Sequence, residues 1–119
     1  MDIKALDNAL AEIVKKREEL AKVDYNNPKY DDLEEQLHDL EDAFQDEYGE
    51  YLEEAFQDIH DKFAPDSDVL LPIAYLGKGV YVEVDQYPGK DTKLMLVPAP
   101  PRIVLTVGKD KHEVVWTAQ

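Results

Sequence analysis

The chain has 119 residues and no cysteine, which fits one domain and excludes disulfides and thiolate metal sites. Acidic residues outnumber basic ones 27 to 13, so phosphates would be repelled and direct nucleic-acid binding is not expected. No apolar run approaches the roughly 20 residues of a membrane span, and the charged, apolar-alternating N-terminus is unlike a signal peptide. We therefore expect a cytoplasmic protein without membrane contact, and nothing indicates a metal or another cofactor.

Charge and composition divide the chain near residue 68. Residues 1–68 carry 22 acidic and 7 basic side chains, a net charge of −15, whereas residues 69–119 carry 5 and 6, a net charge of +1. The second part is also rich in Val, Tyr, Pro and Gly. We expect a single α+β domain over residues 1–119, with a helical hairpin at 1–64 and an antiparallel sheet at 69–118.

The first helix is expected from Asp2 to Val23, because its apolar residues recur at the spacings of a coiled-coil seam. The seam consists of Ile3, Leu6, Leu10, Ile13 and Leu20, with Arg17 on the same line. Asn27 is then suited to be an N-cap and Pro28 to be a first helical residue. A link this short predicts an antiparallel second helix.

The second helix is expected from Pro28 to Phe63, and Pro65 ends it. Its first half carries a narrow seam that can face the first helix, namely Leu33, Leu37, Leu40 and Phe44. Its second half carries a wider, aromatic stripe of Tyr48, Tyr51, Leu52, Ala55, Phe56, Ile59 and Phe63. Gly49 weakens the middle by about 1 kcal/mol. Because the shorter first helix covers only the first half, the second half should pack against the β region.

The β region is expected to form five strands in an antiparallel meander, since the connections are short. The strands are Leu70–Leu76, Val80–Asp85, Lys93–Val97, Arg102–Val107 and Glu113–Ala118. Alternation predicts one apolar face, packed on the long helix, of Val80, Val82, Val84, Leu94, Leu96, Ile103, Leu105, Val107, Val114 and Trp116. Residues 98–101 have the composition of a polyproline ligand, but their place between two strands indicates a rigid connection.

Negative charge is concentrated on the second helix, which holds 14 acidic and 2 basic residues between Lys29 and Phe63. Its beginning should be neutralised by the end of the first helix, through Lys15, Lys16, Arg17 and Lys22 beside Asp31, Asp32, Glu34 and Glu35. No such neutralisation is expected further along. The plain interpretation of this charge is a solvated surface. The functional interpretation is that a basic protein partner or a cation binds there, or that the surface imitates nucleic-acid phosphates. The residues concerned are Glu41, Asp42, Asp46, Glu47, Glu50, Glu53 and Glu54.

The outer face of the predicted sheet is mixed, with charges toward its ends and an apolar centre. The central residues are Met95, Val97, Val104 and Val115. Contiguous exposed apolar surface usually marks a contact. These residues therefore predict self-association, and a homodimer or other homo-oligomer.

Side chains suited to catalysis are few. The only serine, Ser67, lies between two aspartates without a nearby histidine, which indicates a turn rather than a triad. Glu35 and His38 have the Glu-x-x-His spacing of di-iron bundles, but no second copy of the motif exists. His38 and His60 are expected on the flank of the stripe, among exposed carboxylates. These observations predict a non-enzymatic interaction domain.

Two other interpretations remain open. A small enzyme or ligand-binding protein would place a pocket between the sheet and the long helix, lined by Tyr48, Tyr51, Tyr75, Tyr81 or His60. Alternatively, a helical hairpin with Asp24, Asp31 and Asp32 near its tip, followed by a small β domain, is similar in outline to transcript-cleavage factors that enter the RNA polymerase secondary channel. That resemblance covers the outline of most of the chain and implies regulation of transcription through the acidic hairpin.

Overall fold

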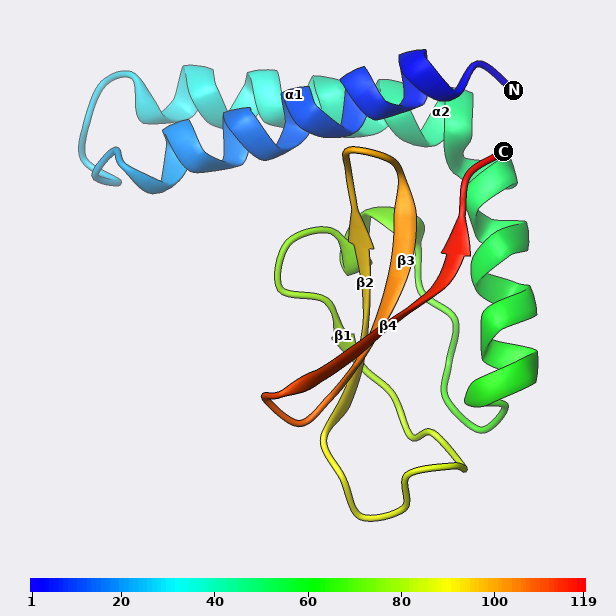
Figure 1. Ribbon diagram of the computed structural model, residues 1–119. Helices are drawn as coiled ribbons and strands as arrows, with labels where there is room; N and C mark the ends of the chain where they lie inside the picture. Colours follow the sequence, from blue (N-terminus) through cyan, green and yellow to red (C-terminus); the bar gives the residue numbers. More distant parts are fainter.

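The computed structural model describes all residues, 1–119, and has two N-terminal helices followed by an antiparallel sheet of four strands. Helix α1 (Ile3–Ala21) and the first half of α2 (Tyr30–Phe63) form a hairpin across one end of the sheet, and the second half of α2 runs along its side (Figure 1). The predicted α+β class is confirmed. Neither helix has an apolar stretch of the length needed to cross a membrane.

The two helix starts differ in how they are capped. The Asp2 carboxylate accepts a hydrogen bond from Ala5 N at 3.0 Å, so α1 begins close to where we expected. The predicted Asn27 cap of α2 is wrong, because its Oδ1 accepts instead from Lys29 N at 2.9 Å. Asn27 therefore stabilises a turn, and α2 starts only at Tyr30, without a side-chain cap.

Helix α2 bends near its middle and wraps around the core (Figure 1). A straight helix of its 34 residues would be about 50 Å long, which exceeds the 47 Å longest extent of the whole molecule. Gly49, near the middle of α2, is buried, and a Cβ there would lie 2.3 Å from Gln45 Nε2. That Nε2 donates to Glu53 Oε1 at 3.0 Å. The absence of a side chain at Gly49 thus lets the Gln45 side chain pass over Gly49 and reach Glu53.

The sheet has the order β1-β2-β3-β4, and its strands are β1 (Val80–Tyr81), β2 (Thr92–Val97), β3 (Arg102–Val107) and β4 (Lys111–Thr117). The predicted fifth strand, Leu70–Leu76, is wrong. A short 3-10 helix, η1 (Pro72–Tyr75), lies there, because proline lacks an N–H and suits a first helical position. Only Leu76 joins the sheet, through an isolated parallel bridge to Leu96.

The predicted strand Val80–Asp85 is shortened to β1 because other groups take its donors. Val82 N still donates to Thr92 O of β2 at 3.0 Å. Glu83 N, however, donates to Ser67 Oγ at 2.9 Å, and Asp85 N donates to Phe63 O at 3.2 Å. The chain therefore leaves the sheet after Val82 and returns toward the end of α2. Ser67 does belong to a turn that satisfies a free backbone donor, as we predicted.

A β-bulge between β3 and β4 changes which residues share a face. Ile103 pairs with Trp116, whereas Val104 pairs with Val114, so Val115 is an extra residue in β4. Trp116 stays on the inner side, opposite Ile103. The prediction that Val114 also lies on the inner face is wrong, because the bulge places Val114 opposite Val104, where it is 51% exposed.

One core joins the helices, η1 and the sheet. Its buried side chains include Leu6, Leu10 and Ile13 of α1, Phe44, Tyr48, Leu52, Phe56 and Ile59 of α2, Tyr75 of η1, and Leu94, Leu96, Ile103 and Leu105 of the sheet. The second half of α2 contacts η1 and β4. At the end of the sheet, Ala99 N donates to Asp7 Oδ1 of α1 at 2.7 Å. Arg102 donates to the carbonyls of Pro98 and Pro100, so residues 98–101 form a connection fixed from both sides.

Candidate functional site

A row of carboxylates follows the outer side of α2. Every fourth residue from position 42 to position 58 is acidic and exposed, and these residues form the acidic ridge: Asp42, Asp46, Glu50, Glu54 and Asp58. Residues four apart are neighbours on a helix, so the ridge is a continuous row about 24 Å long. Each like-charged pair at this spacing destabilises a helix by about 0.2–0.5 kcal/mol. The ridge therefore costs folding stability.

The rest of the molecule does not neutralise the ridge. Only two ion pairs form, Lys16 Nζ with Glu19 Oε2 at 3.1 Å and Arg17 Nη2 with Glu41 Oε2 at 3.3 Å. The basic end of α1 does lie beside the beginning of α2, where Lys16 Nζ donates to Gln36 Oε1 at 2.9 Å, but it forms no ion pair with the acidic residues there. The ridge thus remains an unpaired negative surface.

The predicted partner-binding residues divide into two groups. Asp42, Asp46, Glu50 and Glu54 lie on the ridge, and Glu47 is exposed beside it. Glu41 and Glu53 are half-buried and hold internal contacts, Glu41 with Arg17 and Glu53 with Gln45. Sequence reasoning missed Asp58, although the four-residue spacing that relates the other members also reaches it.

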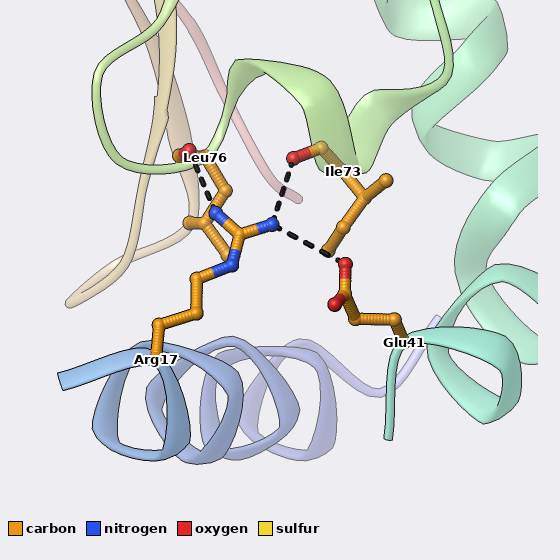
Figure 2. Close-up of polar contacts among 4 residues, drawn as sticks. All are labelled: Arg17, Glu41, Ile73 and Leu76. Carbon is orange, nitrogen blue, oxygen red and sulfur yellow. Dashed lines mark hydrogen bonds and ion pairs between the residues drawn. The ribbon is translucent and has the colours of Figure 1, made fainter. Parts of the chain in front are cut away.

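Arg17 joins the helical hairpin to the β region (Figure 2). Its Nη1 donates to Leu76 O at 2.9 Å, and its Nη2 donates to Ile73 O at 3.4 Å and to Glu41 Oε2 at 3.3 Å. The planar guanidinium suits three acceptors that converge from α2, from η1 and from the residue after it. This explains a charged residue on the apolar seam of α1, and it places Glu41 in a structural role.

Three of the predicted self-association residues, Met95, Val97 and Val104, lie on the outer sheet face, but they are partly covered. The placement of the fourth, Val115, on that face is wrong, because Val115 packs against the core. Met95 and Val104 are cross-strand neighbours, and Val104 is 8% exposed. The Gly79 backbone packs on Met95, since a Cβ there would lie 2.6 Å from Met95 Cγ. Val97 and Val115 are half-buried. Because of the bulge, Val114 rather than Val115 continues the row of Met95 and Val104.

His60 is fully buried, so the prediction that it lies among exposed carboxylates is wrong, whereas His38 is exposed. His60 Nδ1 lies 3.1 Å from Ser67 O, which can only accept, so Nδ1 carries the proton. Nε2 therefore accepts from the Tyr75 hydroxyl at 2.9 Å, and that oxygen accepts from Leu70 N at 3.1 Å. Burial raises the pKa of Tyr75 more than the Leu70 hydrogen bond lowers it, so the hydroxyl stays protonated and donates.

The residues proposed to line a ligand pocket do not share one cavity. Tyr75 and His60 lie within the core, and burial, followed by Glu47 and Asp2, raises the pKa of the buried Tyr48. Tyr51 exchanges hydrogen bonds with the main chain of Gln119. Tyr81 is 70% exposed on the edge strand β1.

A groove that sequence reasoning missed lies beside β1. It is open to solvent, has a volume of about 600 Å3 and lies between three segments, residues 66–70, 80–83 and 90–92; we call it the β1 groove. Two hydrogen bonds fix its walls: Glu83 N donates to Ser67 Oγ at 2.9 Å, and Val82 N donates to Thr92 O at 3.0 Å. The groove is therefore preformed.

No cluster of three His, Asp or Glu side chains in this structure is arranged to hold a metal ion. Comparison of the chain with protein-family models, with curated proteins and with solved structures finds no significant match.

Proposed function

We propose that this protein is a non-enzymatic interaction domain whose acidic ridge binds a basic segment of a partner protein. The observation that supports this proposal is the combination of five exposed carboxylates in one row and the lack of any ion pair to them. A partner that brings lysines or arginines to the ridge relieves the like-charge repulsion, so binding and helix stability are coupled. The long negative row also speeds the encounter with a basic partner at low salt.

Neutralising the ridge separates its cost in stability from its contribution to binding. In the variant Asp46→Asn/Glu50→Gln/Glu54→Gln, all four neighbouring like-charged pairs of the ridge are lost. We expect the free energy of unfolding to rise by about 1–2 kcal/mol at low salt, measured by urea denaturation. We also expect the variant to lose the basic partner that the wild-type chain retains in affinity capture from the native cell, with cross-links mapped to α2.

A matched control carries the same change in charge at the hairpin tip, Asp24→Asn/Asp31→Asn/Asp32→Asn. This control should keep the partner, and raising the salt from about 50 mM to about 300 mM should release it. If the tip variant loses the partner and the ridge variant keeps it, the ridge proposal is wrong. That outcome, with RNA polymerase as the captured protein, would instead favour regulation of transcription through the acidic hairpin.

Self-association is a second proposal, supported by the row of Met95, Val104 and the 51%-exposed Val114. Two copies of net charge −14 repel each other, so a dimer built on this row should strengthen with salt, opposite to the partner complex. Val114→Glu should leave a monomer in sedimentation equilibrium, whereas Thr117→Glu, at the end of the same strand, should not. A wild-type chain that stays monomeric at every salt concentration would rule this dimer out.

A further inference from the structure

The β1 groove exposes the main chain of an edge strand. β1 has β2 as its only strand neighbour. Because Val82 N donates to Thr92 O, the alternation of an antiparallel pair directs the Tyr81 N–H and C=O away from β2. Tyr81 and both of its neighbours line the groove, so this unpaired stretch of main chain borders it.

The side chains that line the groove suit a segment with both apolar and basic residues. The apolar ones are Leu70, Val80, Tyr81 and Val82, and Leu70 and Tyr81 are 44% and 70% exposed. The charged ones are Asp66, Asp68, Glu83 and Asp91, against a single lysine, Lys90. These carboxylates are not arranged to hold a metal ion. They are instead distributed over three segments, as contacts to successive side chains of an extended chain would require.

We propose that the β1 groove binds an extended peptide segment of a partner protein, rich in lysine or arginine, which adds to the sheet as a strand beside β1. Hydrogen bonds between the main chains of the peptide and Tyr81 supply affinity. The apolar and acidic side chains that line the groove supply specificity, because they contact every second side chain of the peptide. The fixed walls reduce the ordering cost of binding, because neither the 66–70 segment nor Thr92 needs to move. This inference goes beyond the acidic ridge, and it stands if the ridge proposal fails.

The test uses 8-residue peptides in which lysine alternates with valine, threonine or tyrosine. Amide shifts in 15N NMR spectra of the full chain locate the binding site, and calorimetry gives the dissociation constant. We expect shifts at residues 66–70, 80–83 and 90–92 with at least one peptide. Asp66→Asn/Asp91→Asn should weaken that binding about fivefold, whereas Glu50→Gln/Glu54→Gln, an equal change in charge on the ridge, should leave it unchanged.

Two control ligands distinguish a strand from simple charge attraction. A peptide N-methylated along one edge cannot donate to β1, and we expect it to bind at least about tenfold more weakly. Spermine carries charge without a peptide backbone and should not shift the amides of the groove. The proposal is overturned if no peptide shifts these amides, if the N-methylated peptide binds equally well, or if spermine reproduces the shifts.

Discussion

Replacing Phe56 by alanine is expected to lower the free energy of unfolding by about 3–5 kcal/mol. Phe56 is fully buried, and its ring stacks on that of Tyr75 with the centroids 4.0 Å apart and the planes 19° apart. Alanine would leave a cavity between α2 and η1, where the hydrogen bonds of Tyr75 to His60 and Leu70 hold the opposite wall in place. Urea denaturation followed by circular dichroism measures the change.

The expected loss is large because domains of this size are stable by only about 5–15 kcal/mol. Tyr25→Ala is the matched control, since Tyr25 is an aromatic residue that is 80% exposed, and it should change the stability by less than about 0.5 kcal/mol. A Phe56→Ala variant as stable as this control would mean that the contact between α2 and η1 is not part of the stable core.

Replacing Arg17 by methionine is expected to cost about 2 kcal/mol of folding stability. Methionine keeps the apolar stem but removes three hydrogen bonds, so the carbonyls of Ile73 and Leu76 lose a donor and Glu41 loses its ion pair. The side chains of Arg17 and Glu41 are 33% and 23% exposed, so water recovers part of the loss. Because these contacts join the helical hairpin to η1, native-state hydrogen exchange should increase at the amides of residues 73–76.

Two further variants identify the origin of this cost. Arg17→Lys retains the charge but not the planar fork, and its stability should lie between those of the wild type and Arg17→Met. Lys16→Met removes the other ion pair, in which the partner Glu19 is exposed to solvent. This variant should lose less than about 0.5 kcal/mol of folding stability. Equal losses in Arg17→Met and Lys16→Met would contradict a special role for the Arg17 contacts.

The helices were predictable because their signals are local. The seam spacing of α1 and the stop at Pro65 depend only on neighbouring residues, and both elements formed close to their expected bounds. The 3-10 helix at Pro72–Tyr75 was not predictable from apolar content, which favours a strand at 70–76, whereas Pro72 favours a helical turn there. The bulge at Val115 depends on how two strands are paired, and neither strand alone contains that information.

The candidate sites also differ in how far local sequence predicts them. The acidic ridge follows from residue spacing on one helix, so most of it can be predicted from the sequence. The contacts of Arg17 bring together residues up to 59 positions apart, and only the charge on an apolar seam hinted at them. The β1 groove joins three segments that are separate in the sequence, and its shape depends on the absence of the predicted strand at 70–76 and the shortening of the one at 80–85.

The bend in α2 has an electrostatic consequence. Because the helix wraps around the core, its convex side faces solvent, to which Asp46 and Glu50 are exposed. Curvature spreads side chains on the convex side of a helix, so neighbouring carboxylates are farther apart than they would be on a straight rod. Mutual repulsion among the acidic side chains therefore favours the curved form of the helix that covers the core.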